Sequence, residues 1–144
     1  MRAWRGFIEG SQRLMEVLNR ELQSRHRISL DDYRILVMLS ESKEGAVRMS
    51  DLADGVLSSR SKLTHQVRRM EADGLVVRST CVEDGRGVLA VITDGGRRRL
   101  AEAAPTHVGG VRRYLIDLLD DDELVGVATV FDKVDAALDT RPDA

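Results

Sequence analysis

Aromatic residues and cysteine are scarce in this sequence. Aromatic side chains make up 3% of its 144 residues, so a hydrophobic core has to be built from aliphatic side chains. The single cysteine, Cys81, excludes a disulfide within the chain and is typical of a reducing compartment. Nothing near it clearly activates the thiol, which favours a half-buried strand residue over a redox sensor. With 42% hydrophobic residues, the chain can bury one core, and its length predicts one domain over residues 1–144.

No stretch of the sequence is both long and apolar enough to span a membrane. A membrane-spanning helix needs about 20 apolar residues. The first residues are interrupted by charges at Arg2, Arg5, Glu9 and Arg13, which also excludes a secretory signal. We therefore expect a cytoplasmic protein that has no membrane partner.

The sequence also lacks the motifs of the common enzyme classes. It has no phosphate-binding glycine loop, nucleophile elbow or paired His–Cys arrangement, and we interpret Gly85 and Gly87 as turn residues. His26, His65 and His107 are too dispersed for a metal-binding spacing, so zinc sensing is a minor alternative. We expect no catalytic residues, no metal and no cofactor.

The charge of the chain is unevenly distributed although the net charge is only −2. Residues 55–99 hold nine basic and five acidic residues, whereas residues 115–144 hold two basic and nine acidic residues. A basic segment inside a weakly acidic protein is consistent with a local nucleic-acid surface, although many solvated helices show such asymmetry.

Two short helix patterns, a glycine stop and a hairpin follow one another between Met49 and Thr93. Ser50 is the expected cap of the first helix, whose apolar side contains Leu52, Ala53 and Val56. Ser59 is the expected cap of the second helix, and Gly74 is expected to end it with a positive φ. The β-branched composition of residues 75–81 and 88–92 predicts two strands joined by a turn at 82–87.

The second helix has two different faces. At about 100° per residue, Leu63, Val67 and Met70 share one stripe, which predicts a core contact. Polar side chains lie on the opposite face or beside it, namely Ser61, Lys62, Thr64, His65, Arg68 and Arg69. Charge alone favours a solvated helix surface, but a short helix, a tight turn, a polar helix and a two-stranded wing together fit the major groove of DNA.

This geometry assigns separate roles to the polar side chains. We expect base-edge contacts from Ser61, Thr64, His65 and Arg68, and phosphate contacts chiefly from Ser59, Arg60, Lys62 and Arg69. At the hairpin tip, Arg86 between two glycines is placed for a narrow minor groove, and Asp84 is the expected partner that orients it.

The order of these motifs carries a family resemblance. The motifs are Leu52-Ala53, Ser59-Arg60-Ser61, Gly74-Leu75-Val76, Asp84-Gly85-Arg86-Gly87 and Thr93-Asp94-Gly95-Gly96. In this order they resemble the winged helix-turn-helix of the MarR family of bacterial transcription regulators; Ile92 replaces the usual leucine. The resemblance implies a mainly α fold with a small antiparallel β wing, in which residues 30–94 form the DNA-binding lobe. It also implies that residues 1–28 and 97–144 form dimerisation helices.

The flanking segments predict long amphipathic helices. Residues 4–25 would span about 30 Å, too long for a chain of this size to bury on its own surface. Ser29 and Asp32 form a capping-box pattern for the next helix, and residues 47–49 could add a third strand. Residues 97–119 predict a helix kinked at Pro105, with its apolar side at Leu100, Ala101, Ala104, Val108, Val111, Tyr114, Leu115 and Leu118. Asp120 or Asp121 is the expected cap of the last helix.

These helices predict a two-fold homodimer and therefore a palindromic operator in double-stranded DNA. Within the family, the most common function is repression relieved by a small molecule, often an aromatic acid. The resemblance places such an effector near Trp4, Tyr33 and His107, although core packing is the better interpretation of each of these residues taken singly. The alternative is a winged-helix protein-interaction module without specific DNA binding. Retention of Arg86 and the basic positions favours the regulator.

Overall fold

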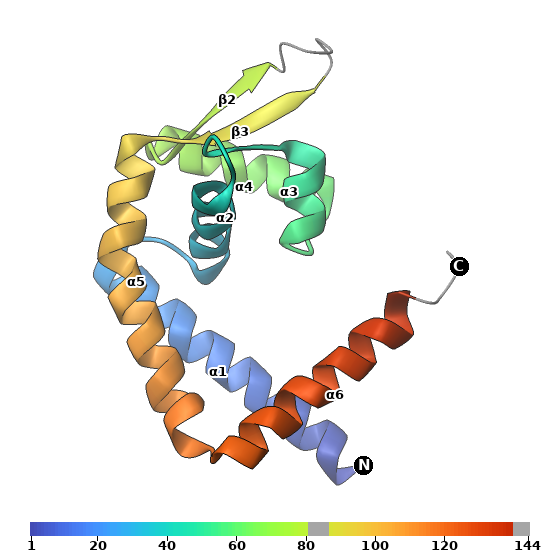
Figure 1. The fold of residues 1–144 in the computed structure, drawn as a ribbon. Coiled ribbons are helices and arrows are strands. Elements are labelled where there is room, and N and C mark those ends of the chain that lie inside the picture. The colour runs from blue at the N-terminus through green and yellow to red at the C-terminus, as the bar shows by residue number, and fades with distance from the viewer. Residues whose placement is uncertain (81–86, 140–144) are drawn as a thin grey trace. The chain divides into compact units, whose positions relative to one another are not determined.

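The computed structural model describes residues 1–80 and 87–139, and they form mainly helices with one small antiparallel sheet (Figure 1). The fold class expected from the sequence is therefore confirmed. The chain divides into two compact units, Met1–Val108 and Gly109–Ala144. The elements, in chain order, are α1 (Arg2–His26), α2 (Leu30–Glu41), β1 (Ala46–Arg48), α3 (Met49–Gly55), α4 (Arg60–Ala72), β2 (Val76–Thr80), β3 (Val88–Ile92), α5 (Asp94–Tyr114), a 3-10 turn (Ile116–Leu118) and α6 (Asp121–Asp139).

The first unit holds an almost wholly aliphatic core. It joins the C-terminal half of α1 to α2, α3, α4 and the sheet, and Tyr33 is its one aromatic member among the described residues. The side chains with no exposed surface include Leu22, Leu36, Leu39, Leu52, Leu63, Val67, Met70 and Val76. The scarcity of aromatic residues is thus met by close packing of leucine, valine and isoleucine.

The start of α2 has the capping box that the sequence predicted. The Ser29 hydroxyl accepts a hydrogen bond from the backbone N–H of Asp32 at 3.0 Å, and Asp32 Oδ2 accepts one from the N–H of Ser29 at 2.9 Å. These bonds satisfy N–H groups that a helix start leaves without partners.

The start of α3 differs from the prediction, because Ser50 does not cap it. The helix begins at Met49, its N-cap is Arg48, and the Ser50 hydroxyl donates to Asp51 Oδ1 at 3.3 Å. The reason lies in the sheet. Arg48 pairs with Leu89 of β3, so the chain stays extended up to Arg48 and turns directly into the helix.

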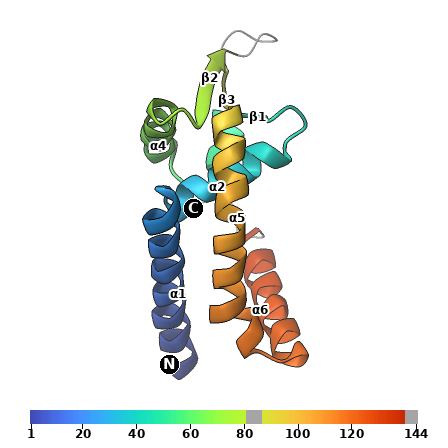
Figure 2. The ribbon, with the colours of Figure 1, turned by 90° about the vertical axis from the view of Figure 1, so that its left-hand side faces the viewer.

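The three strands are arranged in the order β1-β3-β2, and both pairs are antiparallel. Strand β2 runs from the Val76↔Ile92 pair to the Thr80↔Val88 pair, which confirms the hairpin strands. The expected third strand is β1. Figure 2 shows the β2–β3 ribbon projecting beyond the helices of the first unit.

Two glycines explain the connections around this hairpin. Gly74 follows α4 with φ +72°, a conformation that favours glycine, as predicted. Gly96, in the first turn of α5, lies against the Leu75 backbone so closely that an added Cβ would overlap the Leu75 carbonyl oxygen. Thr93 links the residue after α4 to the first turn of α5. Its hydroxyl donates to the Gly74 carbonyl at 2.6 Å and accepts from the N–H of Gly96 at 2.9 Å.

Helix α5 begins at Asp94, continues through Pro105 and ends at Tyr114, earlier than the predicted end near residue 119. Its inward face also differs. Ala103 is fully buried, whereas Ala101, Val108, Tyr114 and Leu118 are exposed within one chain, so the predicted inward position of these four residues is wrong. Pro105 has no N–H to donate to the carbonyl of Ala101, four residues earlier, and Ala101 lies on the exposed side of the helix.

The second unit contains the end of α5 and helix α6. Asp120 Oδ1 accepts from the N–H of Glu123 at 2.8 Å and Glu123 Oε2 accepts from the N–H of Asp120 at 3.0 Å, so Asp120 caps α6 as expected. No residue of α6 is buried, including the apolar stripe formed by Val127, Val130, Phe131, Val134 and Leu138. The apolar face that the sequence predicted is therefore present but uncovered within one chain.

Candidate nucleic-acid interface

Helices α3 and α4 are joined by a tight turn at residues 56–59. The N–H of Ser58 donates to the carbonyl of Ala53 at 2.9 Å, and Leu57 has a positive φ of 53°. Such a φ is uncommon for a residue with a side chain, and the Leu57 side chain points outward and is 87% exposed. The turn is short enough to pack α3 against α4, as a helix-turn-helix requires.

Helix α4 is fixed to the core by one face. The Ser59 hydroxyl caps it by accepting from the N–H of Lys62 at 3.2 Å, as predicted. Leu63, Val67 and Met70 have no exposed surface, which confirms the predicted stripe. Because the apolar stripe is buried, the rotation of the helix about its own axis decides which polar side chains face solvent.

The opposite face of α4 is open to solvent. We call Ser61, Thr64, His65 and Arg68 the groove face. Ser61, His65 and Arg68 are exposed, and Thr64 is half-buried. The Thr64 hydroxyl donates to the carbonyl of Arg60 at 2.8 Å, so it can only accept a hydrogen bond from a further partner. The structure brings the four predicted residues together on one surface, and their contact with bases stays a prediction.

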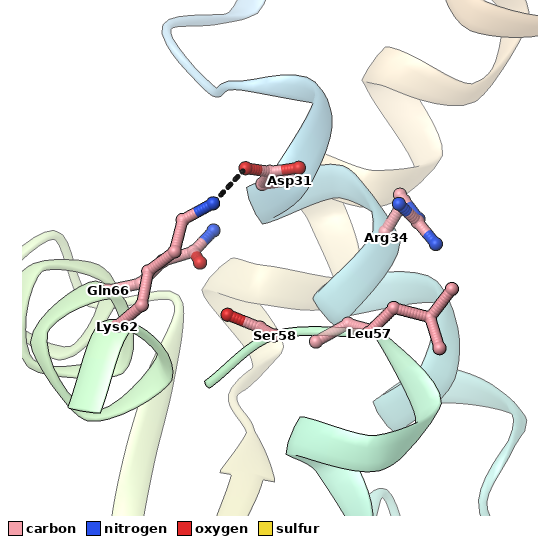
Figure 3. Close-up of a pocket in the computed structure, with 7 residues that line it drawn as sticks. Asp31, Arg34, Leu57, Ser58, Lys62 and Gln66 are labelled. Carbon is pink, nitrogen blue, oxygen red and sulfur yellow. Dashed lines mark ion pairs between the residues drawn. The ribbon is translucent and has the colours of Figure 1, made fainter. Parts of the chain in front are cut away.

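A third side of α4 faces the first turn of α2. We call Lys62, Gln66 and Arg69 the edge row. Gln66 Nε2 donates to Asp32 Oδ1 at 3.0 Å, and Arg69 Nη2 donates to the same oxygen at 2.6 Å. Figure 3 shows Lys62 facing the neighbouring Asp31 across a 3.7 Å ion pair, beside a hollow of about 220 Å³. Sequence reasoning missed Gln66, although its spacing from Lys62 and Arg69 places all three on one side of a helix.

A groove of about 300 Å³ lies between α4, the start of α3 and the start of β3. Its lining residues are Arg48, Met49, Ser50, Arg60, Thr64, Gly87 and Val88. Arg60 was predicted to contact phosphate, whereas Arg48 was predicted only as part of a strand. The groove places both guanidinium-bearing side chains beside Thr64 of the groove face, so Arg48 joins the candidate interface.

The sequence and the structure were compared with those of known proteins, and both comparisons point to one family of proteins. The MarR family matches residues 28–88. The structure of AbsC, a MarR family transcriptional regulator from Streptomyces coelicolor, is 40% identical, covers 96% of this chain and 93% of its own, and superposes with a TM-score of 0.91. The chain belongs to the MarR family. It is therefore a DNA-binding transcriptional regulator and not an enzyme.

Two further relatives of this MarR family member are informative. Sco3205 from Streptomyces coelicolor, a MarR family regulator solved in complex with DNA, is 35% identical with a TM-score of 0.92, and the match covers 98% of this chain and 90% of Sco3205. The HTH-type transcriptional repressor MdtR from Bacillus subtilis is 25% identical over 119 residues, covering 83% of this chain and 76% of MdtR. The family resemblance inferred from the sequence is confirmed.

An ion pair joins strand β2 of the wing to α4 in this MarR family member. The Arg78 side chain donates from Nε and Nη2 to Glu71 Oε2, each at 2.9 Å, and its backbone N–H donates to Glu71 Oε1 at 3.0 Å. These hydrogen bonds lower the pKa of Glu71 below its ordinary value, and the bond from the Arg78 backbone N–H has the largest effect. The predicted wing residues Asp84 and Arg86, together with Cys81, lie outside the described residues.

The three aromatic residues assigned to an effector site separate in this structure. Tyr33 and His107 pack together with ring centroids 4.5 Å apart, whereas Trp4 packs against Phe7 at 6.1 Å and is 60% exposed. Burial raises the pKa of Tyr33 and lowers the pKa of His107. His107 Nδ1 is buried and has no hydrogen-bond partner within the described part of the chain.

Neither a metal site nor a membrane span is found in the described ranges, 1–80 and 87–139. No three His, Cys, Asp or Glu side chains gather there in a way that could hold a metal ion. No helix in these ranges is both long and apolar enough to cross a membrane.

Proposed function

We propose that this MarR family member is a homodimeric repressor that binds palindromic operators through the groove face of α4. The observation that carries the proposal is the division of α4 into one buried stripe and one exposed polar face. An α-helix fits the major groove, where hydroxyl, imidazole and guanidinium groups can distinguish base edges. Ser59, Arg60, Lys62 and Arg69 would contact phosphates beside it.

Exposed apolar surface supports the homodimer. In the N-terminal half of α1, Trp4, Phe7 and Met15 are 60%, 44% and 51% exposed, whereas Leu18 and Leu22 further along the helix are buried. Helix α6 exposes a full apolar stripe. A second copy of the chain can cover both surfaces, and a two-fold dimer presents two α4 helices to two half-sites, which makes the operator palindromic.

The direction of regulation rests on the relatives. MdtR is a transcriptional repressor, and Sco3205 was solved with DNA. A repressor of this kind blocks transcription by occupying its operator. A small aromatic-acid-like effector would relieve repression by binding more tightly to a dimer conformation that fits DNA poorly. Tyr33 and His107, which pack together, are the residues that we propose line this effector site.

Binding to the DNA upstream of the protein's own gene tests the proposal. Specific binding should survive excess mixed-sequence competitor DNA, and it should weaken steeply between low and moderate salt because phosphate contacts release counterions. Footprinting of the bound fragment should show two protected half-sites related by two-fold symmetry. Equal, weak binding to every fragment would contradict the regulator proposal and favour a protein-interaction module.

A further inference from the structure

The carboxylate of Asp32 joins the start of α2 to α4. Asp32 is 6% exposed, and its two oxygens accept three hydrogen bonds from different parts of the chain. Oδ2 accepts from the backbone N–H of Ser29, and Oδ1 accepts from Gln66 Nε2 and Arg69 Nη2. A capping residue needs only the first of these bonds. The other two connect α2 to α4 across more than thirty residues of sequence.

The edge row alternates with the groove face along α4. Lys62 follows Ser61, Gln66 follows His65 and Arg69 follows Arg68, so each edge residue lies about 100° from a groove-face residue. Any rotation of α4 about its axis therefore moves both rows together. With side-chain tips about 5–6 Å from the axis, a rotation of 20° displaces a tip by about 2 Å. That displacement exceeds the distance range over which a hydrogen bond to a base edge is maintained.

The buried stripe fixes which side of α4 faces the core, and the hydrogen bonds to Asp32 restrain the remaining rotation. Leu63, Val67 and Met70 contact the core through dispersion forces, which depend little on direction. The hydrogen bonds to Asp32 are directional, and the one from Arg69 is charge-assisted and short. Asp31, one residue earlier, offers no such restraint, because its ion pair with Lys62 is 3.7 Å long with both side chains more than half exposed.

We propose that Asp32 is a positioning residue that sets the sequence specificity of this regulator by fixing the rotation of α4 through Gln66 and Arg69. The proposal rests on the proposed function, since it concerns how the groove face meets base edges. Asp32 also orients the Arg69 guanidinium, whose side chain remains 54% exposed and can still contact a phosphate. Removing the Asp32 charge therefore releases α4 while it leaves the positive charge of Arg69 in place.

Asp32→Asn and Asp31→Asn form a matched pair of variants that remove the same charge from adjacent residues. Each would be titrated, as the full-length protein, against a duplex selected by the wild type from a random library and against mixed-sequence DNA. The measured quantity is the specificity ratio, which is the Kd for mixed-sequence DNA divided by the Kd for the selected duplex. Asp32→Asn should lower this specificity ratio by about tenfold, the discrimination carried by one base pair, through loss of specific binding only. Asp31→Asn should leave the ratio within about twofold.

A purely structural role of Asp32 predicts a different result. Lower stability reduces the folded fraction, so both Kd values would rise by the same factor and the ratio would stay constant. Circular dichroism melting curves fix a temperature at which each variant is fully folded. Gln66→Met, which keeps the side-chain length and changes no charge, gives a second test if Asp32→Asn unfolds, and it should lower the ratio in the same direction.

Three outcomes are decisive. A reduced ratio for folded Asp32→Asn and for Gln66→Met, with Asp31→Asn unchanged, supports the proposal. An unchanged ratio in folded Asp32→Asn or Gln66→Met, or an equal reduction in Asp31→Asn, overturns it. A wild-type protein that shows no preference for any selected duplex refutes the proposed function itself, and this result is distinct from failure of the Asp32 proposal.

Discussion

Helices α4 and α6 are both amphipathic, but only α4 has its apolar stripe covered within one chain. The stripe of α4 has no exposed surface, whereas Val127, Val130, Phe131 and Val134 of α6 are 40% to 56% exposed. The surfaces opposite the stripes differ as well. The polar face of α4 carries Arg60, Lys62 and Arg68, whereas α6 begins with three successive acidic residues and carries further aspartates.

This difference separates two kinds of amphipathic helix. Exposed apolar patches of this kind mark interaction surfaces, because leaving them in water forgoes about 25 cal/mol per Å² of burial. Helix α4 presents only polar groups outward and is suited to a polar, anionic partner such as DNA. Helix α6 presents apolar groups and is suited to a second copy of the chain, while its acidic residues would repel DNA.

Phe131→Asp should produce the largest effect and would test the assignment of α6. A dimer contains two copies of the change, and each places a charge where an aromatic ring would be buried, so the dimer dissociation constant should rise by about 10⁴-fold. Sedimentation equilibrium over a range of protein concentrations measures this constant. Thr129→Asp adds the same charge on the opposite side of α6 and should leave the dimer intact. Equal dissociation constants for wild type and Phe131→Asp would show that α6 does not dimerise.

Leu63→Ala should produce the next largest effect and tests whether the apolar stripe of α4 stabilises the single chain rather than the dimer. Leu63 is fully buried within one chain, so its truncation should lower the free energy of unfolding by about 3 kcal/mol. Urea denaturation followed by circular dichroism measures the loss. Unlike Phe131→Asp, the folded variant should have the wild-type dimer dissociation constant. A weakened dimer in Leu63→Ala would mean that the α4 core and the dimer surface are coupled.

Arg68→Ala sharpens the comparison on the polar side of α4. Arg68 is exposed on the groove face, so removing it should weaken binding to a selected duplex by about 2 kcal/mol and leave thermal stability unchanged. Fluorescence anisotropy of labelled duplex measures the affinity. Arg20→Ala is the control, because Arg20 is an exposed cation on α1 paired only with Glu16 at the surface. If both variants bind equally well, the groove face does not contact bases.

The features that sequence reasoning recovered depend on short spacings. These features are the Ser29–Asp32 capping box, the Ser59 cap and the stripe of Leu63, Val67 and Met70. In each, the interacting or neighbouring residues are three or four positions apart, so local helix geometry alone fixes them. The groove face followed from the same periodicity. Its exposure could therefore be predicted before its surroundings were known.

The features that sequence reasoning missed depend on tertiary contacts. Ser50 has a capping pattern, but pairing of Arg48 with Leu89 starts the helix before it. Asp32 and Arg69 are 37 residues apart, and no spacing rule links them. On α5, the inward position was assigned to Ala101 and Ala103 was omitted, although the two lie about 200° apart on the helix. The burial of Ala103 depends on its contacts with the core, which the spacing of apolar residues did not show.

His107→Phe should have the smallest effect and tests whether the Tyr33–His107 pair carries a buried neutral imidazole. Burial lowers the pKa of His107 below its ordinary value of 6.5, so as pH falls through that value the unfolded chain takes up a proton that the folded chain resists. Protonation of this group should therefore leave stability unaffected above pH 6.5 and should reduce it modestly below pH 6.5, because solvent reaches part of the ring. His107→Phe keeps the ring contact with Tyr33 but removes the titration, so its unfolding free energy should change less between pH 7 and pH 5.5 than that of the wild type. An identical pH dependence in His107→Phe and in the wild type would show that His107 titrates alike in both states.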